Sequence, residues 1–314
     1  MIGHCNKGLV LVLVLWILTI LMVIALSLSY MVRTDLAGTF AHLRDTEDKY
    51  LALSGIERAK AELVYRRFKL HEEGAEVWRV DGKPYEYDLG SGIVKVRILN
   101  ESSKIDINAA SEALLRQLFI TQGLSEQEAD VIVDSIMDWK DTDNIPRPNG
   151  AEEDYYARLP RPYGIKNGLF DSVDELLYVR GMTREILYGG RGKRGIADLL
   201  TVYSGHNMVS VKYADRDVLR AVPGLTEEII DAIIERRKER EIRGPQDLQD
   251  VLGQSMGEVN KYLSFSESPF FRVESEGRSH RENKRGYGIR AVLALEGNNK
   301  FSIRYYKEPV WLKW

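Results

Sequence analysis

Cysteine is almost absent from this chain of 314 residues, whose single thiol is Cys5. A disulfide framework within one chain is therefore impossible. An excess of one charge is missing as well, because 44 basic and 47 acidic side chains leave a net charge of −3. Such a balance provides no general attraction to nucleic acid.

Catalytic motifs are also scarce. The glycine-rich basic run Gly189–Gly195 lacks the spacing of a phosphate-binding loop, and we expect no serine nucleophile elbow. The histidines are scattered, without the paired spacing of a zinc protease: His4, His42, His71, His206 and His280. The sequence therefore predicts a protein that is not an enzyme.

A long apolar run stands near the N-terminus, from Leu9 to Leu28, interrupted only by Thr19 and Ser27. A helix of about twenty apolar residues spans a bilayer core of roughly 30 Å. A helix of a soluble protein would carry a polar stripe, and none is present in this run. We therefore expect a transmembrane helix over residues 9–32.

The segment before the apolar run, Met1–Gly8, is short, carries Lys7 and ends in glycine. An ordinary signal peptide is cut after its apolar region, whereas cleavage after Gly8 would retain that region. The arrangement resembles the class III leader of type IV pilins and type II secretion pseudopilins. The resemblance implies that a prepilin peptidase cuts between Gly8 and Leu9 and methylates Leu9. An uncleaved signal anchor is the alternative.

The fifth residue after this cleavage site is Leu13. Pilins and most pseudopilins have glutamate at that position, where it neutralises the N-terminal amine of a neighbouring subunit. A carboxylate in lipid is costly and is retained only for function. Its absence implies a subunit with no neighbour ahead of it in the filament.

The helix is predicted to continue beyond the membrane. No proline occurs between Arg33 and Lys69, and apolar residues recur at spacings of three and four. A helix from Leu9 to Lys69 would form a rod of roughly 90 Å. Its apolar face is predicted to contact partner subunits through Leu36, Phe40, Leu43, Leu51 and Ile56.

Strand patterns lie on both sides of a helical block. Before it, Glu76–Val80 and Tyr85–Leu89 are predicted to form a hairpin, followed by a strand over Ile93–Leu99. After it, three more strands are predicted: Phe270–Ser275, Tyr287–Ala294 and Phe301–Tyr306. The sheet thus begins before the helices and ends after them. This order predicts an α+β fold with an inserted all-α domain.

The helical block contains a weak repeat of a short helix, a glycine turn and a longer helix, over Ile107–Val133 and Val211–Ile234. A partial third copy covers Asp171–Met182. The unit resembles the helix-hairpin-helix, whose turn amides hold a phosphate in DNA-binding versions. Here Glu126 and Glu227 follow the turns and would repel a phosphate. A packing scaffold without a nucleic acid partner is therefore favoured.

Oxygen ligands are densest in the stretch Asp138–Tyr156. An irregular loop of this composition suits Ca²⁺, which takes six to eight oxygens at roughly 2.3–2.6 Å. It is not an EF-hand, because Ile145 and Pro146 stand where that loop requires a ligand and a glycine. A soluble acidic loop without an ion explains the composition equally well.

The leader, the anchor, the Asp-Trp-x-Asp-x-Asp run at residues 138–143 and the repeat occur in an order that resembles the K-type minor pseudopilins of type II secretion systems. The resemblance covers most of the chain and is weakest in the C-terminal strands. It implies a structural Ca²⁺ site near the acidic loop. The candidate ligands are Asp141, Asp143, Asn149, Glu152 and Asp154.

The same resemblance implies a non-enzymatic subunit that caps the tip of a periplasmic pseudopilus. Its single transmembrane helix would lie in the inner membrane, with the C-terminal domain in the periplasm. The implied partners are other minor pseudopilins, the prepilin peptidase and the exported substrate. A minor pilin of a type IV pilus or competence filament is one alternative, and a membrane-anchored helix-hairpin-helix DNA-binding protein is another.

The expected domains follow from these segments. The leader and the anchor come first, the two pilin-like parts lie at either end of the head, and the helical segments lie between them. Their bounds are residues 1–8 (leader), 9–32 (anchor), 33–108 (pilin-like part), 109–207 (inserted helical domain with the loop 138–156), 208–264 (second helix-hairpin-helix segment) and 265–314 (C-terminal strands).

Overall fold

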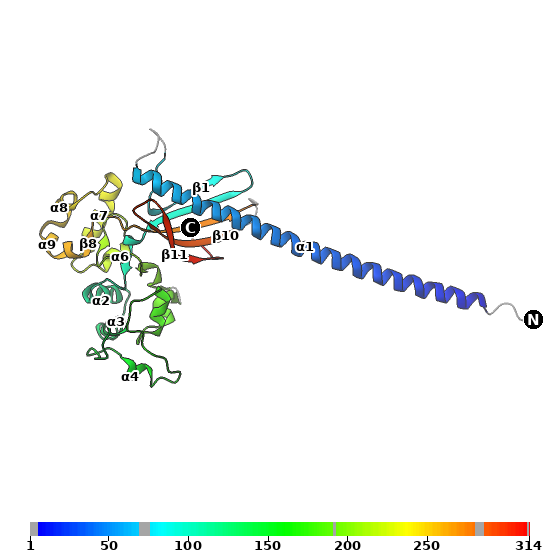
Figure 1. The fold of residues 1–314 in the computed structure, drawn as a ribbon, viewed down its shortest axis with the longest axis horizontal. Coiled ribbons are helices and arrows are strands. Elements are labelled where there is room, and N and C mark those ends of the chain that lie inside the picture. The colour runs from blue at the N-terminus through cyan, green and yellow to red at the C-terminus, as the bar shows by residue number, and fades with distance from the viewer. Residues whose placement is uncertain (1–5, 69–75, 191–192, 280–285, 313) are drawn as a thin grey trace, which may run out of the picture.

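The computed structural model describes residues 6–68, 76–190, 193–279, 286–312 and 314. One helix, α1 (Asn6–Phe68), forms a rod whose N-terminal half projects from the head of the molecule (Figure 1). Residues 9–47 of this helix are exposed. Its most apolar window has a mean hydropathy of 3.3, so α1 is long and apolar enough to cross a membrane.

The head contains an antiparallel sheet of five strands in the order β1-β2-β9-β10-β11. β2 and β9 are hydrogen-bonded neighbours, although the whole inserted part separates them in sequence. The strand bounds are β1 (Asp81–Asp88), β2 (Ile93–Asn100), β9 (Phe270–Arg278), β10 (Tyr287–Leu295) and β11 (Phe301–Lys307).

The C-terminal half of α1 covers one face of this sheet. Alternate residues of β2 point toward the helix, namely Val94, Val96 and Ile98, and all are fully buried. From α1, Leu51 is 7% and Ile56 is 3% exposed in the same core. Predicting these two side chains as partner contacts was therefore wrong, because the sheet already occupies them.

The predicted hairpin between Glu76–Val80 and Tyr85–Leu89 is also wrong. The segment Asp81–Pro84, predicted as its turn, instead begins the edge strand β1, which pairs with β2. The register shifts between Asp81 and Pro84, where Gly82 has a φ of +89°. An edge strand tolerates proline and absorbs turn residues as a bulge, and this explains why the local turn signal misled.

The inserted part leaves the sheet after β2 and returns before β9. Its main helices are α2 (Glu112–Thr121), α3 (Glu126–Lys140), α4 (Glu153–Tyr156), α5 (Arg184–Tyr188), α6 (Arg216–Arg220), α7 (Glu227–Glu239), α8 (Gln249–Leu252) and α9 (Met256–Val259). Short 3-10 turns connect them: η1 (Glu101–Ser103), η2 (Val173–Tyr178), η3 (Ala197–Leu199), η4 (Pro245–Leu248), η5 (Gly253–Ser255) and η6 (Asn260–Tyr262). Two-residue strands complete it: β3 (Ile105–Asp106), β4 (Gly189–Gly190), β5 (Lys193–Arg194), β6 (Leu200–Thr201), β7 (Val209–Ser210) and β8 (Leu263–Ser264).

The inserted part is one packed unit. A single cluster of buried apolar side chains runs from Ile105 to Leu263, across the predicted boundary between residues 207 and 208. α2 and α3 begin where the sequence predicts, because Ser111 and Ser125 cap them and Glu128 completes a capping box. The predicted helices over Ser172–Val179 and Pro245–Leu252 are a 3-10 turn and a split pair, η4 and α8.

Candidate metal centre

Three carboxylates meet at one end of the inserted part. Asp138 lies in the last turn of α3, Asp141 is the C-cap residue of that helix and Glu152 is the N-cap residue of α4. Asp138 and Asp141 share a helix face because they are three residues apart. The loop then returns so that one oxygen from each of the three residues lies within 4.8 Å of the others.

These carboxylates lack enough partners. Asp138 is 0% and Glu152 is 4% exposed. Both oxygens of Glu152 and Oδ1 of Asp141 are buried and accept no hydrogen bond from the residues that the structure describes. Asp138 accepts from the backbone amide of Arg147 at 3.2 Å, and the Arg147 guanidinium lies 3.5 Å away. That guanidinium also binds Glu112 at 2.6 Å, so negative charge remains in excess.

The pKa values of all three carboxyl groups are raised. Burial, followed by repulsion from Asp138 and Asp141, raises the pKa of Glu152 to about 7. Burial raises the pKa of Asp138 to about 6, against the hydrogen bond from the Arg147 amide. The pKa of Asp141 is raised as well, by burial and by Asp143. Without a cation, the cluster can therefore reduce its repulsion only by taking up protons.

The surroundings fix the position of the cluster. A Cβ atom at Gly150 would lie 1.9 Å from Oδ2 of Asp138, so only glycine allows the loop to approach this carboxylate. Next to Asp138, Trp139 points into the core and meets the ring of Tyr156 edge-on, with 5.4 Å between the ring centroids. Nε1 of Trp139 donates to Glu175 at 3.3 Å. The Asp-Trp pair thus directs one side chain to the cluster and the other to the core.

The structure brings some of the predicted ligands to the cluster and directs others away from it. Asp141 and Glu152 belong to the cluster, and the charge of Asp143 reaches both of them. The side-chain amide of Asn149 is turned to Asp134, to which it donates at 3.0 Å. Asp154 is 92% exposed and pairs with Arg158 at 3.4 Å. Asn149 and Asp154 are therefore engaged outside the cluster.

Asp138 is a candidate ligand that was not among those predicted from the sequence. Its three-residue spacing from Asp141 at a helix end was the signal that could have found it. The group of Asp138, Asp141 and Glu152 fits a hard cation, because Ca²⁺ takes carboxylate oxygens and completes its shell with carbonyls and water. A cavity of about 640 Å³ beside Glu152 leaves room for such water.

Residues 95–188, which include the cluster, match the family model for type II secretion system protein K. Type II secretion system protein K of Pectobacterium carotovorum is 26% identical over 199 residues, 58% of this chain and 60% of that protein. The Pseudomonas aeruginosa protein of the same description is 26% identical over 251 residues, 72% of each chain. The chain is therefore similar to type II secretion system protein K over much of its length.

A solved structure has a similar fold. A chain of the GspK–GspI–GspJ complex from the enterotoxigenic Escherichia coli type 2 secretion system superposes with a TM-score of 0.56 at 15% sequence identity. The superposition covers 88% of this chain and 99% of that chain. The two chains therefore share a fold over most of their lengths.

The predicted processing site lies at the beginning of α1. Gly8 and Leu9 fall within the first turns of the helix, and Leu9 is 72% exposed. Residues 1–5 of the predicted leader lie outside the described residues. Cleavage after Gly8 and methylation of Leu9 stay predictions for this chain.

The glycine turns of the repeat share one conformation. Gly123, Gly181 and Gly224 have φ values of +90°, +84° and +89°, which favour glycine. The helices that follow are capped by side chains, because Ser125, Thr183 and Thr226 each accept a backbone amide of the first turn. One amide at the beginning of each helix is therefore already bound within the chain.

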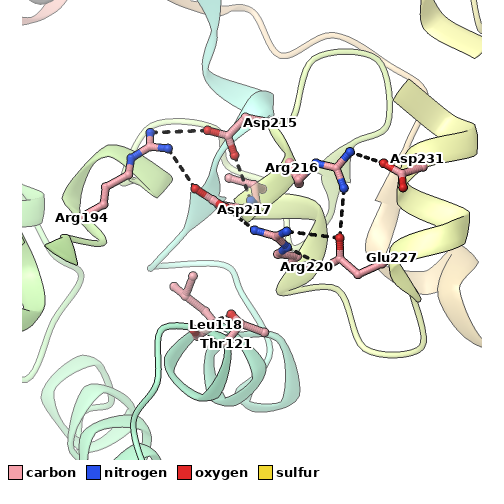
Figure 2. Close-up of polar contacts among 10 residues, drawn as sticks. Leu118, Thr121, Arg194, Asp215, Arg216, Asp217, Arg220, Glu227 and Asp231 are labelled. Atoms are coloured by element: carbon pink, nitrogen blue, oxygen red, sulfur yellow. Dashed lines mark hydrogen bonds and ion pairs between the residues drawn. The ribbon is translucent and has the colours of Figure 1, made fainter. Parts of the chain in front are cut away.

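Basic residues near the turn at Gly224 are also paired. Figure 2 shows that Arg216 and Arg220 both reach Glu227 at the beginning of α7, and that Arg216 also reaches Asp231. Arg194 joins the same network through aspartates that precede and begin α6, Asp215 and Asp217. These pairs connect the helices to one another. They favour the packing role of the repeat, and the absence of a nucleic acid partner stays a prediction.

One serine has the spacing of a nucleophile elbow. The segment Gly253–Gly257 reads Gly-x-Ser-x-Gly. This segment forms η5 and begins α9, directly after helix α8. A nucleophile elbow requires a strand before the serine. The pattern in this place is therefore a turn between helices.

Proposed function

We propose that this chain is the non-enzymatic minor pseudopilin at the tip of the periplasmic pseudopilus in type II secretion. The observation that carries the proposal is the place of the insertion. The helices between β2 and β9 lie on the side of the head away from the N-terminus of α1 (Figure 1). In a filament whose helices point toward the membrane, this bulk would obstruct a subunit stacked above.

The transmembrane segment supports the same position. Leu13 is at the fifth place after the proposed cleavage site, in an exposed stretch of α1. A subunit at the end of the filament has no preceding N-terminal amine to neutralise. The proposed location is the inner membrane, crossed once, with the head in the periplasm before the subunit enters the filament.

The proposed partners are other minor pseudopilins, which would pack along the exposed part of α1. Leu36, Phe40 and Leu43 are 50%, 62% and 55% exposed and lie on one helix face. The solved relative was determined in complex with the proteins named GspI and GspJ. An apolar helix face without a cover in this chain is the feature such subunits would bury. The exported substrate is a further proposed partner.

Replacing Phe40 by aspartate should weaken co-purification of the chain with the other minor pseudopilins by at least about tenfold, because it places a charge in an apolar contact. The measurement is quantitative pull-down from detergent extracts of cells that express all subunits. The control is Ala41→Asp, which adds the same charge to an exposed position about 100° around α1 from Phe40, outside the face formed by Leu36, Phe40 and Leu43. Equal loss in both variants would argue against this face.

N-terminal processing gives a second test of the proposed function. With prepilin peptidase present, we expect intact-mass analysis to show a chain that begins at a methylated Leu9. The variant Gly8→Glu should retain Met1, whereas Gly38→Ala, further along the same helix, should be cut normally. A native chain that keeps Met1 in the presence of active peptidase would contradict the assignment of the leader.

The carboxylate cluster is proposed to hold a structural Ca²⁺ ion. Asp138, Asp141 and Glu152 would bind it, with Asp143 close enough to add negative charge. The ion would neutralise groups that otherwise repel one another and would thereby order the loop between α3 and α4. The loop belongs to the part of the chain that makes the head bulky, so the ion supports the proposed tip position.

A further inference from the structure

A polar cavity lies between the sheet and the inserted part. Its volume is about 670 Å³. One wall is the sheet face opposite α1, because residues of β2, β9 and β10 that alternate with the apolar core point that way. The other wall comes from the inserted part. The charged residues that line the cavity are Asp81, Arg97, Lys104, Arg194, Asp198, Asp215, Arg272, Glu274 and Arg290.

Basic side chains from the sheet lie around Lys104. They are Arg97, Arg272 and Arg290, and the acids bound to them are Glu101 and Glu274. The lining as a whole is nearly balanced, with five basic and four acidic side chains. The carboxylate of Glu101 is 0% exposed and that of Glu274 is 2% exposed, so water screens the charges of these pairs weakly.

The arginines have acidic partners. Nε of Arg272 donates to Glu101 at 2.9 Å. Nε of Arg97 and Nε of Arg290 each donate to Glu274 at 2.5 Å, one to each oxygen of that carboxylate. Glu274 is therefore shared between two guanidinium groups, and each of its oxygens is already bound to one of them.

Lys104 is different. It follows η1, is 6% exposed and lines the cavity, yet its ammonium makes no hydrogen bond or ion pair with any residue that the structure describes. Burial, and then repulsion from Arg272, lowers the pKa of Lys104 to about 7. The carboxylates that act in the opposite direction are Glu101, Asp198 and Glu274. A buried amine without a partner is costly unless something in the cavity binds it.

We propose that this cavity binds a small oxyanion, a carboxylate or phosphate-like group, between Lys104 and Arg272. Such an anion would supply the missing partner of Lys104. A second cavity of about 430 Å³ shares Asp198, Arg272 and Arg290 with the first and is lined by the rings of Tyr188, Tyr203 and Tyr305. It offers room for an organic group attached to the anion. The site is independent of the carboxylate cluster and of the proposed place in the filament.

The first test uses sulfate as the probe, on the full chain purified in detergent. About 10 mM sulfate should raise the thermal midpoint relative to chloride at equal ionic strength, since a ligand of the native state stabilises it. Acetate in a parallel arm distinguishes a site for carboxylates from one for tetrahedral anions. The variant Lys104→Met should lose the response, and Lys238→Met, which changes a 66% exposed lysine, should keep it.

Two further readouts separate a binding site from a structural lysine. Without added anion, Lys104→Met should be at least as stable as the native chain, because it removes a buried charge without a partner. Sulfate keeps its charge between about pH 6 and pH 8, so its affinity should fall about tenfold over this interval as Lys104 loses its proton. Absence of any response to sulfate and acetate, or an equal response in Lys104→Met, would overturn the proposal. If Lys104→Met does not fold, the proposal is still open to disproof. A sulfate affinity of the native chain that does not change between about pH 6 and pH 8 would overturn it.

Discussion

Calcium at about 1 mM is expected to raise the thermal midpoint of the full chain in detergent by several degrees, and a chelator should reverse the increase. The reason is that Asp138, Asp141 and Glu152 bring like charges together in a site where two of them are buried. A cation that binds the folded chain and not the unfolded chain must stabilise it. Magnesium at the same concentration should do less, because it requires a tighter octahedral shell.

The pH dependence of the calcium-free chain follows from the same groups. The pKa of Glu152 rises from 4.5 to about 7 on folding, and that of Asp138 rises from 3.8 to about 6. A raised carboxyl pKa means that the folded state holds protons more tightly than the unfolded state. The stability that these protons contribute is complete below about pH 4 and is lost as the pH rises to about 7. Calcium should therefore stabilise most above pH 7.

Variants of the acidic residues distinguish the ligands from their neighbours. Glu152→Gln should abolish most of the response to calcium and should also raise the midpoint of the calcium-free chain at neutral pH, since it removes one repelling charge. Asp154→Asn changes a carboxylate two residues away that is 92% exposed, and it should leave the response intact. The site assignment fails if Asp154→Asn removes the response and Glu152→Gln does not.

This pair of variants also shows where sequence reasoning about the site reached its limit. The density of acidic residues identified the loop that contributes to the carboxylate cluster, because carboxylates gathered between prolines and a glycine are visible in composition. Choosing among them required the path of the loop. Asn149 turns back to Asp134, and Asp154 follows the first turn of α4 into solvent, whereas Asp138 lies inside a helix and is directed inward.

The fold, too, could be predicted from the sequence only in part. Helix α1 and the strand order around the insertion followed from periodicity and from the return of strand patterns after the helices. Periodicity could not tell which part of one apolar stripe meets the sheet and which part stays free. Leu51 and Leu43 belong to the same stripe, yet one is 7% and the other 55% exposed. That difference depends on where along the rod the sheet is attached.

The attachment of the sheet leads to the second large effect. Gly55 lies where α1 approaches the sheet most closely, and a Cβ atom there would fall 2.1 Å from Oγ of Ser275 and 2.7 Å from a methyl group of Val96. Gly55→Val should therefore force the helix away from β2 and β9. The expected loss of stability is about 3 kcal/mol, the upper part of the usual range for overpacked cores. Such a loss lowers the thermal midpoint by roughly 6–12 °C in a domain of this size.

A control on the same helix removes the effect of helix propensity. Gly38 has no atom within 4 Å of an added Cβ, so Gly38→Val should leave the midpoint of the head unchanged. The same contact can be tested from the sheet, because a Cβ at Gly277 would lie 2.3 Å from the backbone oxygen of Asp48. Gly277→Ala should destabilise the chain as well, since backbone cannot move aside as a side chain can. Equal midpoints for Gly55→Val and Gly38→Val would mean that α1 is not fastened to the sheet at this contact. The helix would then be free to slide or detach, and the rigid connection between the anchor and the head on which a filament subunit depends would be absent.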